Sequence, residues 1–433
     1  MSKKPKSITK SSKIRFLAFF RQYGAVPYLF KWIVITSVVG VLIGTASAGF
    51  LQSLNWVTNY RESHLWIIAL LPLAGLAIGL LYHYYGKEVA AGNNLLIDTI
   101  HQPKQTIPFK MMPFVYLGTI ITHLFGGSAG REGTALQMAG AIADQLSKPF
   151  KLSNEERRIL IISAIAAGFG SVFGTPLAGA IFAMEFFLIG KLKYDAIFPA
   201  FAAAVIADVV TKLWGTPHTH YHIDVVPDMS FANLAYTVIA GVIFGLCAAA
   251  FSKGIHFATK AFKKINYPPI RPVVGGVILV VIIYLSGTTK YIGLGIPTIV
   301  EAFEHEMPMY SFAIKMALTI LTLSAGFKGG EVTPLFFIGA TLGSALAFFI
   351  PLPVALAAGI GFVAVFAGAT NTPIACTLMA IELFGAQCGI YAGIACIVSY
   401  LLSGHTGIYG QQVIGEPKHR RYLFYTGKRI DEI

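Results

Sequence analysis

Long apolar stretches alternate with short basic segments along this chain. Several stretches contain no Asp, Glu, Lys or Arg, among them 32–60, 159–184, 229–252, 272–289 and 332–381, and the last of these runs for 50 residues. Because a helix needs about 20 apolar residues to cross a bilayer, each long stretch predicts at least one membrane-spanning helix. The alternating polarity typical of membrane β-barrel strands is not found. The pattern predicts an all-α polytopic integral membrane protein.

Glycine and proline interrupt these stretches often, with 44 and 21 copies in the chain. Examples lie at 126–127, 168–170, 329–330 and 351–353. Irregular backbone is tolerated at membrane depth only where it lines a cavity or packs inside protein. We therefore expect broken helices, which a simple hydropathy count will miss.

Charged residues make up only 12% of the chain, about half the share of roughly 25% found in soluble domains. This excludes an ordinary soluble enzyme, a disordered chain and a disulfide scaffold. The four cysteines lie in apolar segments without the spacing of a metal site or a disulfide. The net charge of +13 would suggest a nucleic-acid partner for a soluble protein, but here the basic residues flank apolar stretches. We expect no nucleic-acid binding, no enzymatic activity, no metal and no cofactor.

The basic residues gather at the two ends of the chain and in internal connections. Seven of the first 21 residues are Lys or Arg and none is acidic, and five more basic residues lie at 418–429. Positive residues concentrate on the cytoplasmic side of membrane proteins, so both termini are predicted to be cytoplasmic. The basic connections at 148–158 and 253–271 are predicted to face the same side.

Two parts of the chain resemble each other at a nearly constant offset. Residues 130–136 align with 329–335 at an offset of 199, and Gly, Glu, Thr and Leu coincide. Residues 175–178 align with 372–375 at an offset of 197. Two matches in the same order predict two structural repeats.

The connector between the matched segments differs in charge between the repeats. The first connector, 148–158, is basic, whereas the second, 350–353, carries no charge. Opposite membrane sides for the connectors predict inverted repeats, as in transporters whose site lies at the repeat interface; parallel repeats are the alternative. The predicted organisation is a basic cytoplasmic segment at 1–29, a membrane domain at 30–415 with repeats at about 88–215 and 290–410, and a short cytoplasmic tail at 416–433.

Glu132 is an acid inside an apolar segment, where a carboxylate is expensive and indicates function. It lies in the glycine-rich segment 126–134 before an apolar helix, where free N–H groups and the positive end of the helix dipole favour negative charge. A site that stabilises this carboxylate can also hold an inorganic anion once Glu132 is protonated and leaves. Such competition couples a proton to an anion. The alternative is a helix-capping Glu paired with Arg131.

The second repeat places Glu331 and Thr333 ahead of another apolar helix, with Pro334 in its first turn. The Thr333 hydroxyl is suited to donate to an anion or to accept from the backbone. The matching position favours a second functional acid. The alternative is an N-cap Thr333 beside a Glu331 that pairs with Lys328.

Further polar residues in or near the apolar segments have weaker signals. Asn93 precedes a short apolar helix and either presents its amide to an anion or caps the helix; the residues alone favour the cap. Glu185 and Glu382 follow the matched segments at equal spacing, which favours a structural role at the repeat interface over a proton path. The three alternating histidines at 218–222 are interpreted as loop residues rather than metal ligands.

Together these motifs resemble the CLC superfamily of anion channels and anion/proton antiporters. The Gly-Arg-Glu-Gly sequence at 130–133 is similar to the family's gating-glutamate motif, and 329–335 is similar to the motif of its second repeat. Thr-Pro-Leu-Ala-Gly at 175–179 and Gly-Ile-Tyr at 407–409 resemble two further family segments. The resemblance covers about residues 30–415 and implies a homodimer with a separate pathway in each subunit.

The departures from the family pattern narrow the resemblance. Asn93 lies in the segment that usually carries the family's anion-binding Ser, and Thr134 replaces the Pro of the gating motif. The intracellular proton-transfer Glu of chloride/proton antiporters falls at Phe186, and Val332 replaces a Phe that lines the anion site. This combination is similar to the CLC-F subgroup, whose members are bacterial fluoride/proton antiporters.

The resemblance therefore implies a fluoride/proton antiporter that exports fluoride across the bacterial plasma membrane. Glu132 is expected to exchange with the anion and carry protons, and Glu331 to take part in proton transfer. The anion path is expected to involve Asn93, Gly130, Arg131, Gly133, Val332, Thr333 and Tyr409. A passive or voltage-gated chloride or anion channel of the same fold is the alternative, favoured by the absence of an acid at 186. A membrane protein without transport is a third.

Overall fold

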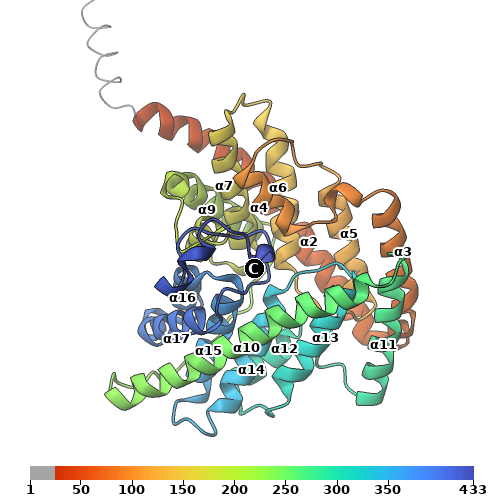
Figure 1. Cartoon of the computed structure of the whole chain (residues 1–433), viewed down its shortest axis with the longest axis vertical. Helices are drawn as coiled ribbons and strands as arrows, with labels where there is room; N and C mark the ends of the chain where they lie inside the picture. The colour runs from red at the N-terminus through yellow and green to blue at the C-terminus, as the bar shows by residue number, and fades with distance from the viewer. Residues whose placement is uncertain (1–24) are drawn as a thin grey trace, which may run out of the picture.

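Helices make up almost the whole structure, a computed structural model that describes residues 25–433 (Figure 1). The first half of the chain contains α2 (Ala25–Ser63), η1 (Leu65–Leu70), α3 (Leu71–Tyr84), η2 (Lys87–Val89), α4 (Asn93–His101), α5 (Met111–Leu124), α6 (Glu132–Asp144), η3 (Gln145–Ser147), α7 (Asn154–Phe173), α8 (Pro176–Glu185), β1 (Leu188–Ile189), η4 (Tyr194–Ala196) and α9 (Ile197–Leu213). The second half contains α10 (Phe231–Lys263), α11 (Ile270–Ser286), α12 (Ile296–Glu304), α13 (Ser311–Ala325), α14 (Val332–Leu346), α15 (Val354–Thr370), α16 (Pro373–Phe384), η5 (Ala386–Cys388), α17 (Gly389–Leu402), β2 (Val413–Ile414), η6 (Arg420–Tyr425) and η7 (Ile430–Glu432).

The helices are broken, as the glycine and proline content predicts. Breaks fall at the predicted segments 126–127, 329–330 and 351–353, but the prediction at 168–170 is wrong, because α7 runs through it without interruption. Within residues 25–433, four helical segments are long and apolar enough to cross a membrane, and several other apolar helices are shorter. The apolar stretch 332–381 divides into α14, α15 and α16, because Asn371 ends α15 at φ +62° and Pro373 begins α16. The stretch 159–184 breaks in the same way at Gly174, with φ +72°, and Pro176. A hydropathy count therefore merges helices that are separate.

The two halves of the chain repeat the same elements in the same order. The series α4 to α8 corresponds to α12 to α16, and in Figure 1 the earlier half lies above and the later half below. An antiparallel bridge joins Gly130 and Gly330, which precede the corresponding helices α6 and α14. The repeats are inverted and meet at the starts of these two helices.

Helix α14 is buried along its whole length, since all 15 of its residues are buried. It crosses α15 where both helices carry glycine: a Cβ on Gly339 would collide with the carbonyl oxygen of Gly361, and a Cβ on Gly361 would collide with that of Gly339. Small residues of this kind let helix backbones approach closely within a membrane. The close contact fixes the position of α14 and therefore of its N-terminus.

The two predicted end segments are partly described by the structure. Residues 1–24 of the predicted basic segment lie outside the described residues, and residues 25–29 of that segment belong to α2. The tail at 416–433 packs back onto the membrane domain. Lys418 Nζ donates to the carbonyl oxygens of Tyr400 (2.6 Å) and Gly404 (2.5 Å) at the end of α17.

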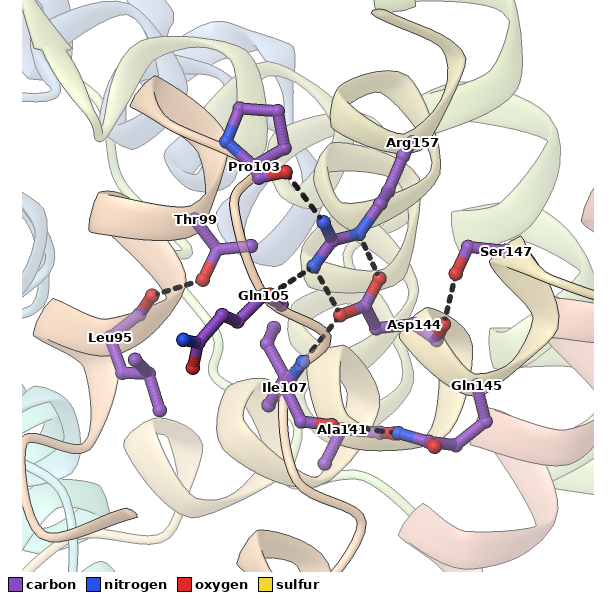
Figure 2. A network of polar contacts seen from close by, with 10 residues as sticks. All are labelled: Leu95, Thr99, Pro103, Gln105, Ile107, Ala141, Asp144, Gln145, Ser147 and Arg157. Carbon is purple, nitrogen blue, oxygen red and sulfur yellow. Dashed lines mark hydrogen bonds and ion pairs between the residues drawn. The ribbon is translucent and has the colours of Figure 1, made fainter. Parts of the chain in front are cut away.

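A buried ion pair fastens the connection between α4 and α5 to the start of α7 (Figure 2). Arg157 Nε lies 2.6 Å from Asp144 Oδ1, and the Ile107 amide donates to Asp144 Oδ2 at 2.6 Å. The Arg157 guanidinium also donates to the carbonyl oxygens of Pro103 (3.0 Å) and Gln105 (2.5 Å). These bonds position the segment that follows α4, and Asn93 is the first residue of this helix.

Removing one partner of this buried pair is expected to be strongly destabilising. Arg157→Met leaves the Asp144 carboxylate buried without its ion partner, which costs about 3–5 kcal/mol. The measurement is the thermal unfolding midpoint in detergent. Lys191→Gln is the matched control: Lys191 and Glu416 form an exposed pair at 3.3 Å, of a kind that contributes at most about 1 kcal/mol. Equal losses in the two variants would contradict the role assigned to Arg157.

Candidate functional site

The N-termini of α6 and α14, which come from opposite repeats, meet in the interior. The Gly130 amide donates to the Gly330 carbonyl oxygen at 2.6 Å, and the Gly330 amide donates back to the Gly130 carbonyl oxygen at 2.8 Å. The positive ends of both helix dipoles and their free N–H groups are thereby brought together. Such a junction is suited to hold negative charge.

Glu132 is the first residue of α6, yet its carboxylate binds the N-terminus of α14 as well as its own. Oε2 accepts from the Thr333 amide at 3.0 Å and the Arg131 amide at 3.1 Å, and Oε1 accepts from the Thr333 hydroxyl at 2.5 Å. The side chain is fully buried, and Arg131 Nε lies 3.5 Å from Oε1. The ion pair of the capping alternative is therefore present. The carboxylate also accepts the free donors at the N-terminus of α14, a kind of position at which anions bind.

Glu331 is the N-cap residue of α14 and is less enclosed than Glu132. Its Oε2 atom is buried and accepts no hydrogen bond from the described residues. The alternative ion pair with Lys328 is not formed, because the Lys328 ammonium lies over the Tyr82 ring, 3.9 Å from its centroid. An unpartnered buried carboxylate oxygen is costly unless it is protonated or binds a ligand.

Asn93 does not cap α4, so the capping interpretation favoured by the residues alone is wrong. Gly92 is the N-cap, Asn93 is the first helical residue, and no side chain caps this helix. A Cβ on Gly133 would lie 3.0 Å from Asn93 Nδ2 and 3.7 Å from Glu331 Oε2. The amide of Asn93 and the free oxygen of Glu331 therefore converge on the space that the missing side chain of Gly133 leaves.

Tyr409 reaches the same region from the segment that follows α17. It is 2% exposed, and its hydroxyl has no hydrogen-bond partner in residues 25–433. It lies within electrostatic range of the carboxylates of Glu331 and Glu132. Its ring meets the Phe186 ring edge-on, with centroids 5.7 Å apart. The buried Val332 begins α14, so the structure brings the sequence-predicted residues into one region.

Two cavities border Arg131 and bring in residues that the sequence analysis did not identify. The larger one has a volume of 630 Å³, and its lining includes Arg61 and Lys290 as well as two acids, Glu62 and Glu301. The smaller one lies against Glu132 and Thr333 and is lined by aromatic residues, among them Tyr221, Phe336 and Phe362. The rings of the last two stack with centroids 4.0 Å apart. Arg61 and Lys290 had a sequence signal, because each directly follows a long apolar stretch.

A buried lysine, also missed, supports the loop that precedes Glu132. Lys315 is completely buried and donates to the carbonyl oxygens of Tyr291 (3.1 Å) and Gly293 (2.7 Å). The Gly293 amide in turn donates to the Gly127 carbonyl oxygen at 3.0 Å, and the Ser128 hydroxyl donates to the Tyr291 carbonyl oxygen at 3.0 Å. Lys315 thus acts on the Glu132 loop through the backbone of 291–293.

Glu185 and Glu382 each bind the start of a helix in the opposite repeat. Glu185 accepts from two amides at the N-terminus of α16, with bonds of 2.9 and 3.3 Å. Glu382 accepts from two amides at the N-terminus of α8, with bonds of 2.7 and 2.9 Å. This reciprocal exchange is the structural role that their equal spacing favours. Of the loop histidines, His218 lies 3.4 Å from Asp208, and the other two are exposed.

Broken helices in inverted repeats, with buried carboxylates at opposed helix N-termini, define a class of integral membrane transport protein. A family model for voltage gated chloride channels matches residues 74–404. The chain therefore belongs to this family, the CLC family.

Similar proteins agree in sequence and in structure. A protein of Pseudomonas syringae pv. tomato described as a chloride/fluoride channel protein is 51% identical over 409 residues, which cover 93% of this chain and 90% of the relative. The crystal structure of a CLC-type fluoride/proton antiporter matches with a TM-score of 0.86 and 35% identity, over 89% of this chain and 98% of the other. A slow cyanobacterial Cl⁻/H⁺ antiporter shares the fold, with a TM-score of 0.76, 20% identity, and coverage of 86% and 94%.

The junction of the two helix N-termini is expected to tolerate no added side chain. A Cβ on Gly330 would lie 2.7 Å from the Gly133 amide nitrogen, and overpacking of this kind costs about 1–3 kcal/mol. Gly330→Ala should therefore lower the thermal unfolding midpoint in detergent. Gly49→Ala, in α2, is the control, because no atom lies within 4 Å of its Cβ position and alanine favours helix. An unchanged midpoint for Gly330→Ala would show that the junction is looser than described.

Proposed function

We propose that this protein exports fluoride from the bacterial cytoplasm in exchange for protons. The main support for the proposal is the position of the Glu132 carboxylate. It lies at the N-terminus of α14, where it accepts hydrogen bonds from the Thr333 amide and hydroxyl. These donors suit any small anion. The 51% identical relative is described as a chloride/fluoride channel protein, and the 35% identical structure as a CLC-type fluoride/proton antiporter.

The exchange follows from competition between the Glu132 carboxylate and the anion for this binding position. A protonated Glu132 loses its charge and with it the attraction of the helix N-terminus, so its side chain leaves and the anion enters. Fluoride is small and strongly hydrated, and strong donors must replace its water. The Thr333 amide and hydroxyl are such donors at the N-terminus of α14, and Asn93 Nδ2 is a further donor beside Gly133. Arg131, Gly130, Val332 and Tyr409 complete the proposed anion path.

We assign proton transfer on the inner side to Glu331. Phe186 is completely buried, stacks on Phe182 with ring centroids 5.2 Å apart, and cannot carry a proton. Glu331 has a buried oxygen without a hydrogen-bond partner in the described chain, close to Gly133 and Asn93. A proton on that oxygen satisfies it, and its transfer to Glu132 requires the two carboxyl groups to come within hydrogen-bond reach, directly or through one water.

The remaining assignments concern the setting of the protein. We propose that it lies in the bacterial plasma membrane with both termini in the cytoplasm, supported by the basic connection 148–158 and the basic tail. We also propose a homodimer with one complete pathway in each subunit. Membership of the CLC family supports this assignment.

The test is fluoride and proton flux in proteoliposomes loaded with fluoride. A fluoride-selective electrode and a pH electrode record both fluxes, with and without a proton ionophore. Antiport requires fluoride efflux to drive protons inward against their gradient. A fluoride current that reverses at the equilibrium potential of fluoride alone would identify the alternative, a passive channel of the same fold. The absence of an acid at Phe186 favours that alternative. Competition with excess chloride also tests it.

Glu132→Gln is expected to abolish proton movement, because the amide is permanently uncharged and carries no proton. Fluoride-driven proton uptake is the measurement. Glu304→Gln changes an exposed acid on α12 and should leave coupling unchanged. Preserved coupling in Glu132→Gln would refute the role of this carboxylate.

Thr333→Val is expected to weaken fluoride binding without disturbing the fold, because it removes the hydroxyl and keeps the shape. A hydrogen bond to a charged group contributes about 1.5–3 kcal/mol, so the apparent affinity should fall roughly tenfold or more. Thr333→Ser keeps the hydroxyl and should stay within about a factor of three. The concentration dependence of fluoride efflux measures the affinity of each variant. Equal affinities in Thr333→Val and the wild type would show that the hydroxyl does not bind the anion.

A further inference from the structure

A second large cavity, of 600 Å³, lies between α3, α10, α11 and α13, apart from the Glu132 site. Four basic side chains line it: Lys87, Lys263, Arg271 and Lys328. Its lining contains no Asp or Glu. A cavity of this size is in the range that holds small ligands, and its charge selects anions.

These four cations lack acidic partners. In the part of the chain that the structure describes, none of them forms an ion pair with a carboxylate. Glu88 follows Lys87 directly but pairs with Lys110, at 2.7 Å. Like charges around one cavity repel each other, and an anionic occupant removes that repulsion.

The cavity lies at one end of its helices, beside exposed aromatic residues. Three of its basic residues belong to the end of α10, the start of α11 and the segment after α3, which the positive-inside rule places on the cytoplasmic side. Lys328 lies in the connection between α13 and α14. Tyr84, Tyr85 and Tyr267 are exposed by 63%, 69% and 40% next to these helix ends. Tyrosines gather at the headgroup level of membranes. Phe262 and Pro272 give the cavity an apolar wall.

We propose that this cavity binds the phosphate headgroup of an anionic phospholipid. Lys and Arg are strong phosphate partners, and basic pockets between membrane helices on the cytoplasmic side are suited to such headgroups. The aromatic rim at headgroup depth favours a lipid over a soluble phosphate. Lys328 connects the cavity to the anion path, because it precedes Glu331 by three residues. The binding itself does not depend on the proposed transport function.

The test is native mass spectrometry of the detergent-purified full chain, titrated with cardiolipin and, separately, with phosphatidylcholine. The wild type should retain cardiolipin selectively. The double variant Lys87→Gln/Lys263→Gln should weaken cardiolipin binding roughly tenfold or more, as expected from about 1 kcal/mol for each basic residue. Both lysines are exposed, so folding should be unaffected, and the unfolding midpoint checks this.

The matched control is Lys253→Gln/Lys260→Gln, which removes two exposed lysines of α10 that do not line the cavity. It should retain cardiolipin like the wild type. Equal retention by all three proteins, or equal losses in the two double variants, would overturn the site. In a second arm, inorganic phosphate is added to the cardiolipin-bound wild type. Displacement of the lipid at submillimolar phosphate would overturn the lipid assignment in favour of a soluble phosphate ligand.

Discussion

The carboxylate of Glu132 is held by the first turn of a helix from the other half of the chain, and the fold is arranged around this contact. A fully buried charge is tolerated because two backbone amides, a hydroxyl and the Arg131 guanidinium surround it. A helix N-terminus can offer its free amides to a buried carboxylate only where the helix begins inside the protein. Broken helices are therefore a requirement of the site, and the Gly130–Gly330 bridge holds the two starts in register.

Other carboxylates in the structure also lie at helix starts. Whether all their oxygens have hydrogen-bond partners distinguishes the structural carboxylates from those proposed to function in transport. Glu185 and Glu382 each satisfy their two oxygens with backbone amides across the repeat interface. They close the symmetric fold and leave no free position. Glu331 instead has an oxygen without a partner among the described residues. The departure from symmetry thus lies beside Gly133 and Asn93, where the proposed ligand and proton chemistry needs an open position.

Buried cations surround this interior. Lys315 is completely buried and donates only to carbonyl oxygens. Arg61 is also buried; it donates to the His123 carbonyl oxygen at 2.7 Å and pairs with the exposed Glu62 at 3.5 Å. Such charges raise the electrostatic potential of the region for any anion. The scarcity of charged residues therefore does not mean weak electrostatics, since each buried charge acts in a low dielectric.

Much of the fold was predictable from local pattern. Apolar stretches predict helices, the segments 126–127, 329–330 and 351–353 predict three of their breaks, and the charge of the two connectors predicts the inversion. The prediction of Glu132 as a helix-start acid rests on the same local chemistry. Predictions were weaker where a side chain has several local options: Asn93 was favoured as a cap, but Gly92, with φ +60°, takes that place.

The sequence by itself determined the class of fold, the repeat and the identity of the acids, because these follow from hydrophobicity, glycine and proline positions and the energetic cost of charge in an apolar setting. Only the tertiary structure decided which helix start receives each carboxylate, and that Tyr221, Phe336 and Phe362 line the cavity beside Glu132. The contact between Glu132 and Thr333 joins residues 201 positions apart. Such a contact depends on how two helices cross, which local pattern does not specify.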